Sequence, residues 1–152
     1  MNMPITATRK TADAAAIAGR LRLSVTRLSR VLRRQAETGL TASQLSALAT
    51  VEHHGAMTLG ALAEHERVAP PSVTKLVHKL EGVGLLSRAA SPDDGRVALV
   101  SLTADGRELL AESRQRKNEW LAERLSRLSS EERARLADAL DVLDTVLTQE
   151  QP

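Results

Sequence analysis

The chain has 152 residues, a mass of 16.4 kDa and a formal net charge of +2 at pH 7. This length suits one domain with its own hydrophobic core. The chain contains no cysteine, which excludes a disulfide scaffold and a thiolate nucleophile. No apolar run reaches the roughly 18–20 residues of a membrane span, and the first residues lack the apolar segment of a signal peptide. The sequence therefore predicts a cytoplasmic protein.

Charge is unevenly distributed along the chain. Residues 1–40 hold eight Lys/Arg against two Asp/Glu, residues 41–102 hold five against six, and residues 103–152 hold eight against eleven. The middle of the chain is therefore not basic as a whole. Bulk charge permits binding to nucleic acid but does not by itself argue for it.

The first part of the chain predicts an arm followed by a helix. Residues 1–11 lack periodicity and are expected to form a flexible arm. From about Ala12 to Glu37, apolar residues recur at helical spacing; they are Ile17, Leu21, Leu28 and Leu32. Arginines cover the rest of this helix, either as a surface for the DNA backbone or as a solvated border of an interface.

Two further helices are predicted by their capping residues. Thr41 and Gln44 form a T-x-x-Q capping box for a helix from about Ala42 to His53, and its inward residues are expected to be Leu45, Leu48 and Ala49. Thr58 is expected to cap the next helix, whose apolar face holds Leu59, Leu62 and Ala63. A short turn over residues 67–69 follows.

A fourth helix is expected from about Pro70 to Glu81, because proline is well tolerated in the first turn of a helix. Glycine at position 82 or 84 is expected to end it. Its buried stripe contains Val73, Leu76, Val77 and Leu80. Its outward residues are Ser72, Thr74, Lys75, His78 and Lys79. Such hydroxyls and amines suit phosphates and base edges, although the same residue types also make an ordinary solvated face.

The next segment has the pattern of a β-hairpin. The runs 85–90 and 97–102 flank the sequence SPDDGR, whose Pro, Asp and Gly favour a turn. Arg96 lies just after the turn, where its guanidinium can reach a minor groove, and Asp94 is placed to brace a nearby arginine. The alternative for Arg96 is an ordinary exposed charge on a hairpin.

The last third of the chain predicts two long helices. Thr103 is expected to cap a helix to about Leu128, and Ser129 with Glu132 forms a second capping box. A final apolar stripe follows, made of Leu136, Leu140, Leu143 and Leu147. These helices and the first one carry more apolar surface than the shorter helices and hairpin of residues 41–102 can cover. An intertwined homodimer would bury it, and two-fold symmetry would suit an inverted-repeat operator with half-sites about one helical turn apart.

The segment from Thr58 to Leu109 resembles the signature of the multiple antibiotic resistance regulator (MarR) family. The matching motifs are LxxLA at 59–63, SVTKLVHKLEGVGLLSR at 72–88 and SPDDGRVALVSLTADGREL at 91–109. The family wing carries aspartate, a variable residue and arginine, here Asp94, Gly95 and Arg96. Glycine at the variable position removes one DNA contact available to relatives, and the double proline stands where a serine or threonine cap is more usual.

This resemblance extends from about residue 21 to 147 and implies a mainly α fold with a small β-hairpin wing. Residues 41–102 would form the winged helix-turn-helix of a single MarR-type domain, and residues 12–40 and 103–152 its dimerisation helices. The expected DNA-binding residues are Pro71, Ser72, Thr74, Lys75, His78, Lys79, Arg88, Asp94 and Arg96. The resemblance further implies a homodimeric repressor that binds double-stranded DNA and is released by a small aromatic or anionic effector.

Two other functions stay open. The four histidines show no metal-ligand spacing, and adjacent His53 and His54 are expected to point apart on a helix. A metal-responsive regulator that uses them with Glu64 or His65 is nevertheless one alternative. A helical interaction module that has lost DNA binding is the other. No nucleophile elbow, Walker or dinucleotide motif is present, so we expect no enzyme, cofactor or metal.

Overall fold

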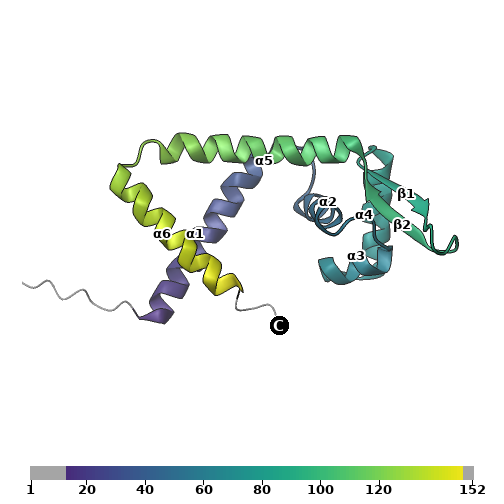
Figure 1. The fold of residues 1–152 in the computed structure, drawn as a ribbon, viewed down its shortest axis with the longest axis horizontal. Helices are drawn as coiled ribbons and strands as arrows, with labels where there is room; N and C mark the ends of the chain where they lie inside the picture. The colour runs from purple at the N-terminus through teal and green to yellow at the C-terminus, as the bar shows by residue number, and fades with distance from the viewer. Residues whose placement is uncertain (1–12, 149–152) are drawn as a thin grey trace, which may run out of the picture. The chain divides into compact units, whose positions relative to one another are not determined.

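A computed structural model describes residues 13–148 of the chain (Figure 1). The expected flexible arm over residues 1–11 lies outside the described residues. The chain divides into two units, residues 1–34 and residues 35–152. No helix of residues 13–148 is long and apolar enough to cross a membrane.

The first unit is built on α1, which runs from Ala14 to Gln35. It forms where the apolar periodicity predicts a helix, and Arg33 and Arg34 in its last turn complement the partial negative charge of a helix C-terminus. None of its residues is buried. Ile17, Leu21 and Leu28 of the predicted stripe are 51%, 40% and 43% exposed.

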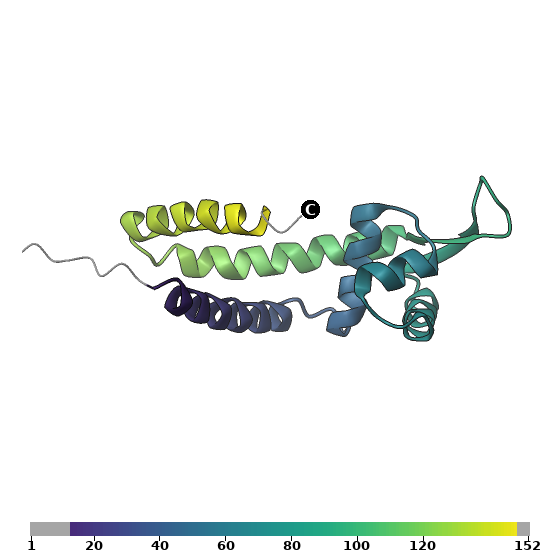
Figure 2. The same cartoon turned by 90° about the horizontal axis from the view of Figure 1, so that it is seen from below.

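The second unit contains a winged helix-turn-helix followed by two long helices. Its elements are α2 (Ala42–His54), α3 (Leu59–Glu66), α4 (Pro70–Gly82), β1 (Leu86–Ala90), β2 (Ala98–Leu102), α5 (Ala104–Leu125) and α6 (Ser130–Thr148). Figures 1 and 2 show the β1–β2 hairpin projecting beyond α2–α4 as the wing, before the chain enters α5. The mainly helical fold with one small hairpin is confirmed.

The predicted helix caps are present. Thr41 Oγ1 accepts the N–H of Gln44 at 3.2 Å, and Gln44 Oε1 accepts the N–H of Thr41 at 2.8 Å. The Thr58 hydroxyl accepts the N–H of Ala61 to cap α3, and the Thr103 hydroxyl accepts the N–H of Gly106 to cap α5. The Ser129–Glu132 box is complete as well.

α4 ends at a glycine, as expected: Gly84 takes a left-handed φ of +76° just after the cap Val83, its N–H donates to the carbonyl of Glu81, and the N–H of Leu85 donates to that of Leu80. The ends of other elements differ from the prediction. α5 ends at Leu125 rather than near Leu128, because the chain turns after it and the Ser126 hydroxyl donates to the carbonyl of Glu123. Each strand begins one residue later than expected.

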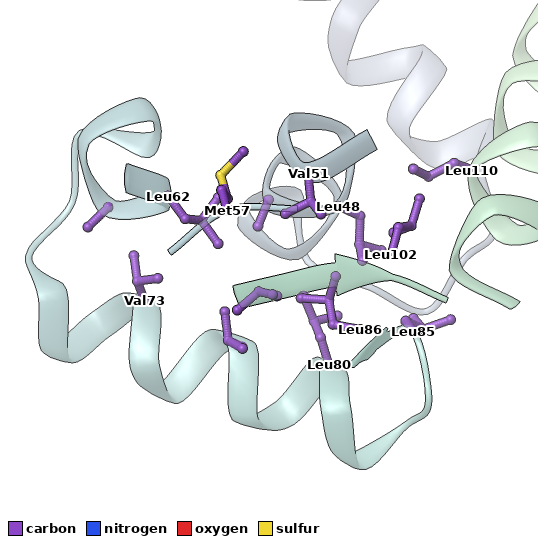
Figure 3. Packing of buried hydrophobic residues seen from close by; sticks show 14 residues of the cluster. Leu48, Val51, Met57, Leu62, Val73, Leu80, Leu85, Leu86, Leu102 and Leu110 are labelled. Carbon is purple, nitrogen blue, oxygen red and sulfur yellow. The ribbon is translucent and has the colours of Figure 1, made fainter. Parts of the chain in front are cut away.

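The hydrophobic core of the second unit lies among α2, α3, α4, the hairpin and the start of α5 (Figure 3). Its fully buried members include Leu48, Leu62, Leu80 and Val100. Ala49 was expected to face inward and does not, since it is exposed while its neighbour Ala47 is completely buried. Both alanines fit a helical stripe, and the packing of α2 against α3 and the hairpin decides between them.

The wing is a two-stranded antiparallel sheet in which Leu86 pairs with Leu102 and Ala90 with Ala98. Met57, between α2 and α3, adds one further bridge to it. The N–H of Met57 donates to the carbonyl of Val100 at 3.1 Å, and the N–H of Val100 donates back at 2.7 Å. This bridge ties the hairpin to the helix-turn-helix.

Candidate nucleic-acid interface

The outward side of α4 carries the residues that the sequence singles out. Val73, Val77 and Leu80 are buried, and Leu76 is half-buried. All six site candidates of this helix are exposed, and they are Pro71, Ser72, Thr74, Lys75, His78 and Lys79. Residues 70–80 contain no Asp or Glu, so no carboxylate on this stretch would repel a phosphate.

Part of this face is gathered around one shallow hollow of about 260 Å³. Ser72, Lys75 and Lys79 line it together with Thr41 and Gln44 at the start of α2. The sequence missed the last two as neighbours of α4, because they were recognised only as a capping box. Two lysines and three polar residues therefore border the same hollow between the start of α2 and α4.

The remaining candidates of α4 differ in what they can offer. The Thr74 hydroxyl donates to the carbonyl of Pro70 at 3.0 Å, so its oxygen stays available as an acceptor.

The turn between α3 and α4 is held by backbone hydrogen bonds. Arg67 in this turn adopts a left-handed conformation with φ +54° and is exposed. Its N–H donates to the carbonyl of Glu64 at 3.2 Å, and the N–H of Val68 donates to the carbonyl of Ala63 at 3.1 Å.

The wing brings two arginines to one surface. Arg88 on β1 and Arg96 after the turn line the same hollow of about 270 Å³. Asp94 does not form an ion pair with either arginine. Its Oδ1 accepts the backbone N–H of Arg96 at 3.0 Å, which fixes the turn and so orients the arginine indirectly.

Arg88 has a partner that the sequence did not reveal. Its guanidinium donates to Glu81 Oε2 at 3.0 Å, and the two side chains are 33% and 24% exposed. The pair joins the end of α4 to β1, seven residues further along the chain. Nothing in the spacing predicts it, because α4 must end and the chain must reverse before the two groups can meet.

Three histidines lie together, at the ends of α2 and α3. The ring of His54 stacks on that of His65 with centroids 4.1 Å apart. The ring of His53 meets the His54 ring edge-on, with centroids 4.7 Å apart. The expectation that His53 and His54 point apart is therefore wrong, because the helix ends there. Desolvation, then the charges of His65 and His53, lower the pKa of His54. Over residues 13–148, no group of three or more His, Cys, Asp or Glu side chains is arranged to hold a metal ion.

The fold and its exposed surfaces define a winged helix-turn-helix protein. Residues 40–98 match the model of the MarR family. An uncharacterised HTH-type transcriptional regulator of Mycobacterium bovis is 48% identical over 130 residues, which cover 85% of this chain and 91% of that relative. An HTH-type transcriptional repressor of Bacillus subtilis is 34% identical over 62% of this chain and 61% of its own length.

A solved structure has the same fold. A MarR family protein from Bacillus stearothermophilus is 25% identical, covers 88% of this chain and 94% of its own, and superposes with a TM-score of 0.74. The chain belongs to the MarR family, as its sequence motifs predict. It is a transcriptional regulator of the helix-turn-helix type.

Proposed function

We propose that the protein is a homodimeric repressor that reads an inverted-repeat operator through α4 and the wing. The observation that carries the proposal is the exposed side of α4, where hydroxyl and ammonium groups stand without a carboxylate over residues 70–80. A helix of this kind can enter the major groove. The arginine-lined wing then reaches the adjacent minor groove.

Each candidate has a role in this arrangement. Ser72, Thr74, Lys75 and His78 reach base edges or phosphates of the major groove, and Lys79 and Pro71 border them. Arg96 enters the minor groove, with Asp94 holding its backbone. Arg88 contacts a phosphate after it leaves Glu81. Because four of these residues in each subunit are Lys or Arg, binding should weaken steeply as salt concentration rises.

The proposed dimer rests on apolar side chains that the single chain leaves exposed. α6 presents Leu136, Leu140 and Leu147 at 39%, 51% and 58% exposure, and α1 adds the stripe described above. A soluble protein rarely leaves this much apolar surface exposed unless another molecule covers it, so these stripes mark an interaction site. Residues 12–40 and 103–152 would therefore form the dimerisation region of a single MarR-type domain, and residues 41–102 its DNA-reading part.

Repression and release by a small molecule complete the proposal. One relative is named a repressor, and a dimer bound across a promoter would exclude polymerase. An effector that binds better to a conformation with unsuitable half-site spacing would shift the population away from DNA. The effector would be a small aromatic or anionic molecule, as the family resemblance implies.

Fluorescence anisotropy with labelled DNA from upstream of the protein's own gene tests the proposal, with a scrambled duplex as reference. Wild type should prefer the upstream DNA. Lys75→Ala and Arg96→Ala should each weaken binding about tenfold and lower the salt slope by about 1 per lost contact. Arg127→Ala removes an exposed positive charge just after α5 and serves as the matched control.

Two outcomes would contradict the proposal. If the protein does not prefer the upstream DNA and a random-sequence selection yields no bound duplex either, the protein is an interaction module that has lost DNA binding. If DNA binding requires a divalent metal and is abolished by a chelator, the protein is a metal-responsive regulator instead.

A further inference from the structure

A cavity of about 290 Å³ lies between α2, α3 and α4, at the small end of the range for ligand pockets. Its apolar lining includes Leu62 and Val73 from the core and the half-buried Leu76. Its polar lining consists of Ser43, Ser46 and Glu66. Among residues 13–148, no Lys, Arg or His side chain lines it. The cavity is therefore apolar with a single carboxylate.

Glu66 is placed to receive a positive charge. It is the last residue of α3 and is half-buried. The Thr50 hydroxyl donates to its Oε1 at 2.5 Å. Within residues 13–148, Oε2 accepts no hydrogen bond and the carboxylate forms no ion pair with a Lys or Arg. A carboxylate beside apolar side chains gains most from a charged donor. Glu66 also lies at the C-terminus of α3, where the partial negative charge of the helix dipole favours a bound cation.

The start of α4 offers nothing to an anion. A helix N-terminus normally attracts anions through its free N–H groups. Here Pro70 and Pro71 have no N–H, and the N–H groups of Ser72 and Val73 both point to the carbonyl of Ala69, at 2.9 and 3.3 Å. The first turn therefore has no donor to spare, and the cavity favours a cation.

The two serines complete a set of acceptors. Ser43 and Ser46 lie three residues apart on α2 and so share one face of that helix. Neither hydroxyl is held by a side-chain hydrogen bond within the described part of the chain. An ammonium group carries two or three N–H donors, so it can be shared between a carboxylate and hydroxyl oxygens.

We propose that this cavity binds a small primary or secondary amine in its protonated form. Glu66 pairs with the ammonium group, Ser43 and Ser46 accept hydrogen bonds from the remaining N–H donors, and a ring or branched alkyl group packs on Leu62 and Val73. Because α2, α3 and α4 all line the cavity, the ligand contacts the helix that reads DNA. A change in DNA affinity on amine binding rests on the proposed function; the binding itself does not.

The test is an NMR titration of the full-length protein with benzylamine, followed through backbone amide shifts. Benzyl alcohol and sodium benzoate serve as neutral and anionic probes of the same shape. Benzylamine should give saturable shifts centred on Ala47, Leu62 and Val73, and the other two probes should bind at least about tenfold more weakly. Glu66→Gln should lower benzylamine affinity about tenfold, the usual loss for a charged hydrogen bond.

Glu64→Gln removes an exposed carboxylate of the same helix that does not line the cavity, and should leave binding unchanged. Ser46→Ala should weaken benzylamine binding severalfold. Because Ser46 is exposed, this variant should fold, and it tests the site if Glu66→Gln does not fold. Absence of saturable shifts, equal affinity for benzoate, or unchanged affinity in both cavity variants would overturn the proposal. Benzylamine binding by a protein that binds no DNA would instead refute the proposed function and leave this site standing.

Discussion

Arg114 of α5 holds Glu52 of α2 through two hydrogen bonds, 62 residues apart in the chain. Its two terminal nitrogens donate to the two carboxylate oxygens at 2.6 and 3.1 Å. The hydrogen bonds from Arg114 are the largest cause lowering the pKa of Glu52 below its ordinary value of 4.5, and those to Glu52 raise the pKa of Arg114. The long helix that leaves the wing is thereby fastened to the helix-turn-helix.

Arg114→Ala should lower the free energy of unfolding by about 0.5–1 kcal/mol, since the pair is bidentate but the side chains are 54% and 30% exposed. Because the folded-state pKa of Glu52 is lowered, the ion pair stabilises the folded protein above pH 4.5, and this stabilisation is lost as the pH falls below that value. Urea unfolding at pH 7 and pH 3 measures both effects. Arg127→Ala, which breaks the exposed pair with Glu123, should cost less. An equal loss at both pH values would contradict the assignment.

Gly106 is required at the start of α5 by a close approach of the chain. A Cβ atom there would overlap the carbonyl oxygen of Leu85 and lie 2.8 Å from Cδ1 of Leu102. Gly106→Ala should therefore destabilise the protein by about 1–3 kcal/mol, measured by thermal unfolding. Gly82→Ala is the matched control, because nothing lies within 4 Å of its Cβ and alanine favours a helix. Equal melting temperatures for the two variants would refute this account of Gly106.

Local signals in the sequence predicted most of this fold. The caps at Thr41, Thr58, Thr103 and Ser129 each need only residues within one helical turn, and all four form. What failed or was missed depends on packing between distant segments. Ala47 rather than Ala49 faces the core because neighbouring elements choose between two nearly equivalent positions of α2.

The functional surface divides in the same way. The polar face of α4 follows from helical periodicity, so its exposed residues were predictable. The Glu81–Arg88 pair, the hollow shared by Arg88 and Arg96, and the Glu66 cavity all join separate elements. No spacing rule in one sequence contains that information, since it depends on how the turns bring those elements together.

The stacked histidines should make stability depend on pH. The pKa of His54 is lowered in the folded state, so the unfolded chain binds a proton more readily. The stabilising contribution is complete above the ordinary pKa of 6.5 and decreases as the pH falls through that value toward the lower folded pKa. His54→Gln should flatten this part of the stability profile in urea unfolding from pH 5 to pH 8, while His78→Gln, at an exposed position of α4, should not. A profile unchanged by His54→Gln would contradict the prediction.

The Glu81–Arg88 pair should restrain DNA binding in the free protein. Glu81 neutralises Arg88 at a distance of 3.0 Å, so a phosphate must replace that carboxylate before Arg88 can contact DNA. Glu81→Gln removes the competing charge and should raise affinity for DNA severalfold, because Arg88 no longer has to give up an ion pair before it meets the DNA backbone. Anisotropy across a salt series measures this effect. Arg88→Ala alone should weaken binding, and adding Glu81→Gln to it should restore nothing, since the gain requires a free guanidinium. If the double variant instead regained wild-type affinity, the effect of Glu81 would be general charge repulsion and not the release of Arg88.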